Sequence, residues 1–143
     1  MGRSIIEGHY GDGDLSFVTA YLISEKPKIE GSIRLYVDTG ASRTIVNSLD
    51  AEKIRINYNK LKKYPYPVSG ISGPIKPYYI EDCILIFGEN QIKEYLDQVL
   101  VIPPQQDENS KIIHPPSVVG LDVLRKYRIS FTEEKVILER RRE

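Results

Sequence analysis

The sequence contains few of the residues that build disulfides and metal centres. Among its 143 residues it has one cysteine, Cys83, and two histidines, His9 and His114, which lie far apart in the chain. A disulfide needs two cysteines, and zinc sites usually combine closely spaced cysteine and histidine ligands. The sequence therefore excludes an intrachain disulfide and predicts a protein without a metal site.

An excess of charge and long apolar runs are also missing. The 20 basic residues balance the 20 acidic ones, and no apolar stretch reaches the length of a membrane-spanning helix. We therefore expect no nucleic-acid or membrane partner, and we interpret the three arginines at 140–142 as a solvated tail. A lone cysteine and the lack of a basic-then-apolar start lead us to expect a cytoplasmic protein.

The pattern of apolar residues predicts strands. A length of 143 residues fits one domain, residues 1–143, with one core. Two short helices are indicated, one over 48–54 capped by Asn47 and one after Gly120. We predict an all-β domain with one or two short helices and with strands at 15–24, 33–37, 83–87, 96–102, 117–119, 128–131 and 135–138. Loops are expected at 25–31, 55–64 and 103–116, and residues 1–14 should lie loosely or pair as an edge strand.

One predicted strand delivers an acid at its end. Apolar and polar residues alternate over 33–37, and the strand runs directly into Asp38-Thr39-Gly40. Gly40 permits a tight turn, and the Thr39 hydroxyl can tie that turn to a neighbouring segment. Such a turn can hold an aspartate in a fixed position, although the tripeptide alone also fits an ordinary Asx turn.

A glycine-rich hairpin is predicted in the middle of the chain. Residues 64–80 contain several prolines and, at their centre, the glycines Gly70 and Gly73 around Ile71 and Ser72. Proline stiffens extended arms and glycine permits the backbone of a tight tip, so the segment fits a mobile hairpin. A plain surface hairpin is the alternative.

A second apolar strand, 117–119, ends at Gly120 and is followed by Asp122. We expect Asp122 to be a hydrogen-bonded structural acid. His114, in the loop before this strand, has no serine or cysteine nucleophile in a matching context, so we interpret it as an exposed loop histidine.

In this order, the DTGAS motif, the glycine hairpin and the apolar-apolar-Gly-x-Asp motif resemble the retropepsin family. These are dimeric aspartic peptidases that include retroviral proteases and their cellular and prokaryotic relatives. The resemblance covers about residues 15–138 and implies a closed barrel with a flap hairpin. One lobe offers one catalytic aspartate, so it also implies a homodimer that cleaves protein or peptide substrates without a cofactor.

The resemblance also assigns roles to individual residues. It makes Asp38 the catalytic residue. It places the substrate-binding flap over 70–73. It assigns Gly120 and Asp122 as supports of the active-site loop. The active-site loop itself would contain Thr39, Gly40 and Ala41, and the flap tip Gly70, Ile71, Ser72 and Gly73. Arg43, Ile45 and Ile71 are candidates for lining the cleft.

The chain departs from the retroviral pattern at two positions. Retroviral members commonly have an acid where this chain has Ser42 and an arginine where it has Leu121, so the ion pair between these positions is missing. The difference favours the cellular and prokaryotic branch. A catalytically inactive retropepsin-like module that binds extended peptides by strand addition is the alternative function.

Overall fold

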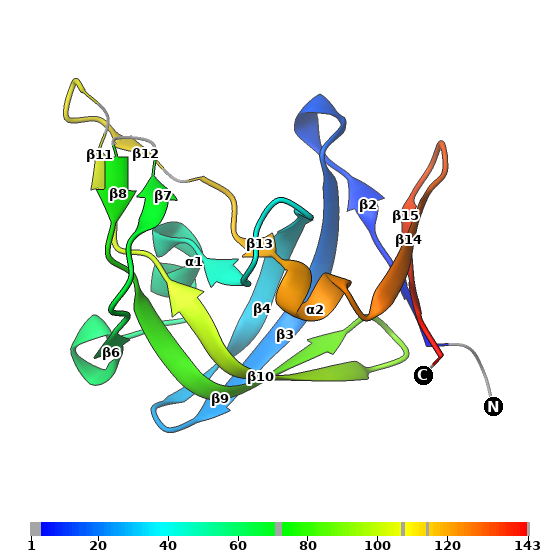
Figure 1. The fold of residues 1–143 in the computed structure, drawn as a ribbon, viewed down its shortest axis with the longest axis horizontal. Helices are drawn as coiled ribbons and strands as arrows, with labels where there is room; N and C mark the ends of the chain where they lie inside the picture. The colour runs from blue at the N-terminus through cyan, green and yellow to red at the C-terminus, as the bar shows by residue number, and fades with distance from the viewer. Residues whose placement is uncertain (1–3, 71–72, 107, 114, 143) are drawn as a thin grey trace.

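The structure, a computed structural model, describes residues 4–70, 73–106, 108–113 and 115–142, and strands dominate it (Figure 1). Its short helices are α1 (Ser48–Lys53), α2 (Leu121–Leu124) and the 3-10 turns η1 (Asp12–Asp14) and η2 (Tyr58–Lys60). The strands are β1 (Ile5–Glu7), β2 (His9–Tyr10), β3 (Ser16–Glu25), β4 (Lys28–Val37), β5 (Ile45–Val46), β6 (Lys62–Lys63), β7 (Val68–Gly70), β8 (Gly73–Ile75), β9 (Tyr78–Phe87), β10 (Ile92–Val101), β11 (Gln105–Gln106), β12 (Ile112–Ile113), β13 (Val118–Val119), β14 (Tyr127–Phe131) and β15 (Val136–Arg140).

The main sheet closes on itself. Its strands follow one another in the order β3, β4, β13, β5, β10 and β9, and β9 pairs back with β3 to complete a ring of six. Closure removes exposed strand edges within the ring. The predicted all-β closed barrel with one or two short helices is therefore confirmed, with α1 and α2 as the helices.

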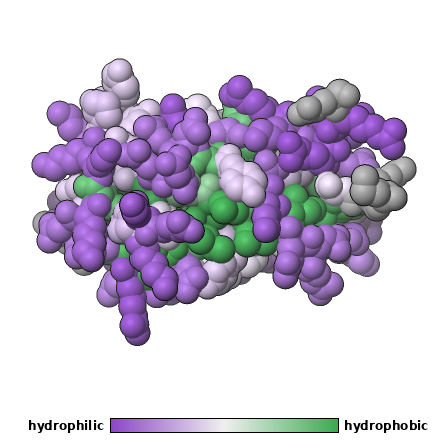
Figure 2. All heavy atoms as spheres, turned by 90° about the horizontal axis from the view of Figure 1, so that it is seen from below, coloured by the Kyte–Doolittle hydropathy of each residue, from purple (hydrophilic) through white to green (hydrophobic). Residues whose placement is uncertain are grey.

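Alternation along the four long strands places the core inside the barrel. Leu22, Leu35, Phe87 and Val99, one from each long strand, are completely buried. Outward-facing positions also carry some apolar surface: Tyr21 is 40% exposed, opposite Ile86 across the β3–β9 pairing. The face below these strands accordingly shows a central apolar strip bordered by hydrophilic side chains (Figure 2).

The strands are longer than their apolar runs suggest. The predicted loop 25–31 is in fact a two-residue turn at Lys26 and Pro27, because the pairing of β3 with β4 continues to Glu25 and Lys28. In the same way β9 begins at Tyr78, five residues before the predicted strand 83–87. Exposed charged residues such as Glu25 and Lys28 end the apolar pattern of the first pair, and Glu81 and Asp82 interrupt it within β9, so the apolar runs alone underestimate the strand lengths.

The loops predicted over 55–64 and 103–116 contain short elements. The first holds η2 and β6, which pairs with β9, and the second holds the paired strands β11 and β12. The predicted edge pairing of residues 1–14 is found as β1 on β15 and β2 on β3. None of the helices in the described ranges is long and apolar enough to cross a membrane.

The arginines near the C-terminus are not all solvated, which corrects our interpretation. Arg140 Nη1 donates to Glu94 Oε2 at 2.8 Å, and Arg141 Nε donates to the Tyr127 carbonyl at 3.2 Å. Glu94 is only 2% exposed, and a buried carboxylate needs partners of this kind. Arg140 is therefore bound by an acid that lies far away in the sequence, and Arg141 is bound by a backbone carbonyl.

Candidate active site

Asp38 stands directly after β4, where β4 and β13 run side by side in parallel. Its backbone N–H donates to the Val119 carbonyl at 3.2 Å, which fixes the position of the residue. Its side chain is partly exposed, and Oδ1 accepts a 2.9 Å hydrogen bond from the Gly40 N–H. Oδ2 has no hydrogen-bond partner among the described residues, so this carboxylate keeps an oxygen available for chemistry.

Gly120 allows the second apolar strand to pass directly behind this turn. A Cβ atom on Gly120 would lie 2.6 Å from the Arg43 carbonyl oxygen and 2.7 Å from that of Ala41. Both atoms belong to the backbone, so they cannot move aside as a flexible side chain would. The next residue, Leu121, donates its N–H to the Ala41 carbonyl at 2.8 Å and so joins α2 to the turn.

Thr44 and Asp122 connect the same two segments through side chains. Asp122 Oδ2 accepts from the Thr44 N–H and Oδ1 accepts from the Thr44 hydroxyl, each at 2.8 Å. The hydroxyl also accepts from the Gly120 N–H at 3.3 Å. Thr44 is completely buried, and our sequence reasoning did not select it, because its run is apolar enough to be interpreted simply as extended chain.

A second set of polar contacts holds the segment that follows β5. The Ser117 hydroxyl accepts from the Asn47 N–H at 2.9 Å and donates to Asp50 Oδ2 at 2.5 Å. Asn47 Oδ1 in turn caps α1 by accepting from the Asp50 N–H at 2.7 Å. The segment 44–50 is therefore fixed to β13 and its neighbours at both ends.

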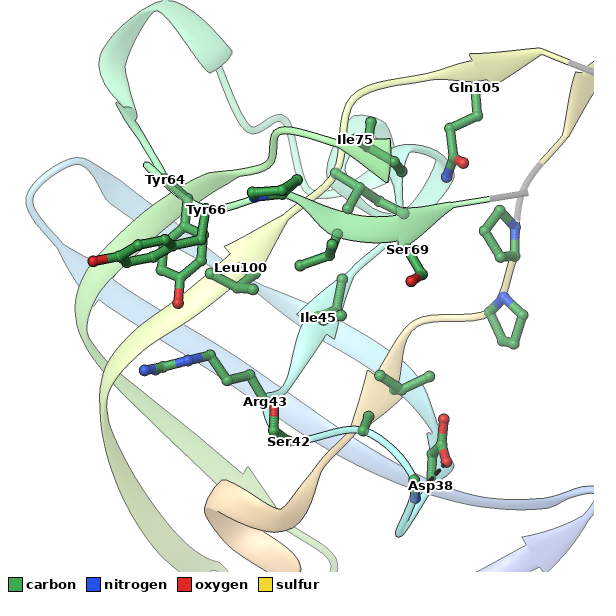
Figure 3. Close-up of a pocket in the computed structure, with 18 residues that line it drawn as sticks. Asp38, Ser42, Arg43, Ile45, Tyr64, Tyr66, Ser69, Ile75, Leu100 and Gln105 are labelled. Carbon is green, nitrogen blue, oxygen red and sulfur yellow. Dashed lines mark hydrogen bonds between the residues drawn. The ribbon is translucent and has the colours of Figure 1, made fainter. Parts of the chain in front are cut away.

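The turn opens into a groove with a volume of about 800 Å³ (Figure 3). Asp38 lies at one end, and Arg43 extends toward the end where Tyr64 and Tyr66 lie. Arg43 and Ile45, two of the predicted cleft residues, line it, whereas Ile71 lies outside the described residues. The described lining consists of Asp38, Gly40, Ala41, Ser42, Arg43, Ile45, Tyr64, Tyr66, Pro67, Val68, Ser69, Ile75, Leu100, Ile102, Gln105, Pro115, Pro116 and Val118.

The predicted glycine hairpin borders the groove. β7 and β8 pair antiparallel with Gly70 opposite Gly73, and Gly73 has a φ of +117°, a value that favours glycine. Val68, Ser69 and Ile75 face the groove from these strands. The tip residues predicted at 71 and 72 lie outside the described residues, as does His114.

Two other ionisable groups are held in their neutral forms. Burial raises the pKa of the Cys83 thiol to about 12, so this cysteine has little thiolate and is not a nucleophile. Burial, followed by the neighbouring Tyr78, raises the pKa of Tyr58, whose hydroxyl donates to the Ile102 carbonyl at 2.9 Å. No cluster of potential metal ligands is found in the described parts of the chain.

Comparisons with known proteins identify the fold. No protein-family model and no curated protein matches this sequence. A retropepsin-like aspartic protease from Rickettsia conorii matches in structure with a TM-score of 0.62 and 21% identity, covering 96% of this chain and 99% of that one. The EIAV protease in complex with an inhibitor matches with a TM-score of 0.48 and 13% identity, covering 81% and 90%. The chain has a retropepsin-like fold, as its motifs predict.

Proposed function

We propose that this protein is an aspartic endopeptidase whose active site is completed by a second copy of the chain. The observation that carries the proposal is Asp38 itself, a partly exposed carboxylate at the end of a groove, on a turn held from behind by Gly120 and Thr44. A fixed carboxylate beside an open groove is what a water-activating site requires.

The chemistry needs two carboxylates, and each chain offers one on this turn. A two-fold homodimer would bring Asp38 together with the same residue of the partner. Two carboxylates at hydrogen-bonding range share one proton, because both cannot be ionised at once. The ionised one takes a proton from water as the water oxygen bonds to the peptide carbon, and the neutral one protonates the carbonyl oxygen. Collapse then breaks the C–N bond as a proton passes to the leaving nitrogen.

The residues that follow Asp38, and the glycine hairpin, would contribute to dimer formation and substrate binding. Thr39 is exposed, and its hydroxyl would donate across the two-fold axis to the partner's turn. Gly40 would offer its carbonyl to the substrate backbone. The hairpin that carries Gly70 and Gly73 would act as a flap, closing over the peptide and excluding water, and its backbone N–H groups would bind the substrate.

The surface around Thr39 supports association with a second copy. A hollow beside Asp38 and Thr39 is lined by Leu15 and Phe131, among other residues. Leu15 is 39% exposed and Phe131 64% exposed, which is unfavourable for apolar side chains in water. A partner that covers them would at the same time bring its own turn toward Asp38.

Cleavage of an unfolded protein over pH about 3 to 7 tests the proposal, because a carboxylate pair operates in that range. We expect fragments that disappear with pepstatin and with Asp38→Asn. Cleavage by the pure Asp38→Asn protein would exclude Asp38 as the catalytic group. A verified dimer that cleaves nothing but binds extended peptides would favour the alternative, an inactive peptide-binding module.

A further inference from the structure

The groove carries a single cation in its described lining. Arg43 and Asp38 are the charged residues there, and most of the remaining side chains are apolar or aromatic. An ionised group beside apolar walls interacts more strongly with an opposite charge than it would in water. The guanidinium is therefore placed where it can discriminate between peptides.

Arg43 forms no ion pair with any carboxylate in the part of the chain that the structure describes. Asp97 and Asp122 border a neighbouring hollow with it, but Asp122 is occupied by Thr44, and no ion pair joins either acid to Arg43. The ion pairs found among the described residues are Lys62 with Glu81, Lys126 and Arg140 with Glu94, and Lys135 with Glu7.

The arginine is nevertheless held in position. Its Cζ lies 5.7 Å from the centre of the Tyr64 ring, within the range of a cation–π contact. Tyr64 is itself supported by edge contacts with Tyr66 at 5.7 Å and Tyr79 at 6.1 Å between ring centres. The backbone of Arg43 is fixed by the close approach of Gly120. A group ordered in advance loses less entropy when it binds a partner.

We propose that Arg43 determines substrate specificity by pairing with an acidic side chain of the peptide. The substrate class is then an extended peptide with Asp or Glu at the position that reaches the Tyr64 end of the groove. Guanidinium and carboxylate match in a bidentate geometry, which makes the pairing selective as well as attractive. This inference rests on the proposed function.

Two-fold symmetry sharpens the expectation. If a homodimer forms around the Asp38 pair, Arg43 occurs in both halves of the groove at equal distances from the scissile bond. The preferred substrate therefore carries acidic side chains at matching positions on both sides of the cleaved bond. A peptide with one of these acidic side chains should be cleaved faster than a peptide with neither.

The charge near this end of the groove agrees with an acidic substrate. Residues 53–64, which lead directly into Tyr64, contain five basic residues and no acidic one, and one of the five, Lys62, is paired with Glu81. Such an excess attracts acidic peptides before they bind and raises the association rate at low salt. The basic residues are Lys53, Arg55, Lys60, Lys62 and Lys63.

The test compares matched peptides that differ by one charge. A peptide taken from a cleaved protein is prepared with Glu or with Gln at each position around the scissile bond, and kcat/KM is measured for each pair. We expect Glu to be favoured about tenfold over Gln at one position on each side. Arg43→Glu should abolish this preference and favour Lys at the same positions.

A control variant separates local recognition from overall charge. Lys93→Glu makes the same two-unit change at an exposed position on β10, at the opposite end of that strand from the groove residue Leu100. It should retain the full preference for Glu. If Arg43 were merely structural, its replacement would lower kcat/KM for Glu and Gln peptides by the same factor, and this result would overturn the inference.

The outcomes also distinguish the inference from the proposed function. Cleavage that does not discriminate Glu from Gln at any position would overturn the role of Arg43 and leave the peptidase intact. If the wild type cleaves nothing, a set of labelled extended peptides, each made once with Glu and once with Gln at one position, is compared by fluorescence anisotropy. Tighter binding of Glu peptides that is lost in Arg43→Glu would then support the inference, and equal or absent binding would overturn it.

Discussion

Asp38 and Glu94 are carboxylates of one chain in contrasting surroundings. Glu94 is 2% exposed and accepts from the Tyr127 hydroxyl at 2.5 Å, from Arg140 at 2.8 Å and from Lys126 at 3.3 Å. Asp38 is partly exposed and accepts from the Gly40 N–H. An acid that is fully paired stabilises the fold, whereas an acid that is fixed but left open is available for substrate.

The largest expected effect is on activity at Asp38. Asp38→Asn keeps the shape of the side chain but removes the charge that would activate water in the proposed reaction, so kcat/KM should fall by at least about a thousandfold. Stability should change by less than about 0.5 kcal/mol, because the side chain is partly exposed and has one hydrogen bond. Peptide cleavage measures kcat/KM and urea unfolding measures stability. A large loss of stability would contradict the difference that we expect between Asp38 and Glu94.

The opposite result is expected at Glu94. Glu94→Gln leaves Tyr127 and Arg140 without their charged partner and should reduce the free energy of unfolding by about 2–3 kcal/mol. The activity of the remaining folded protein should be unchanged. Glu7→Gln is a matched control in the exposed ion pair with Lys135, where less than about 0.5 kcal/mol is expected. Equal effects of the two variants in urea unfolding would contradict this account.

Thr44 lies between these extremes, because it supports the active-site turn without facing the groove. Thr44→Val removes the hydroxyl that joins Asp122 to Gly120 and should cost about 2 kcal/mol. We also expect lower activity per folded molecule, since the turn loses its support. Thr44→Ser keeps the hydroxyl and should retain most of both properties. Wild-type activity in a folded Thr44→Val would show that this support is not needed.

The smallest effect concerns pH and Cys83. Its pKa is about 12 in the folded protein, against 9.0 for a free thiol, so the unfolded state loses the proton first as the pH rises. The stability contributed by the neutral thiol is complete below pH 9.0 and declines above it by at most about 1.4 kcal/mol per pH unit. Cys83→Ala should show a shallower decline between pH 8 and 10 in urea unfolding. Parallel curves for the two proteins would refute the assignment.

The sequence predicted those features that depend on local pattern. Alternating apolar residues indicated the barrel strands, and the DTG turn and Gly120 indicated where two segments meet. It did not predict which polar groups pair, because Thr44 and Asp122 are 78 residues apart and Glu94 and Arg140 are 46 apart. Periodicity reports which residues are buried, but the partner of a buried polar group depends on the whole topology.

The central claim is that one active site contains Asp38 from two chains. It is tested most directly by mixing wild type with equal amounts of Asp38→Asn and allowing the subunits to exchange. If both carboxylates are needed, random pairing leaves about a quarter of the dimers active, so activity should fall to about one quarter of that of the same total amount of wild type. A fall to about one half would show that each chain acts alone and would contradict the account.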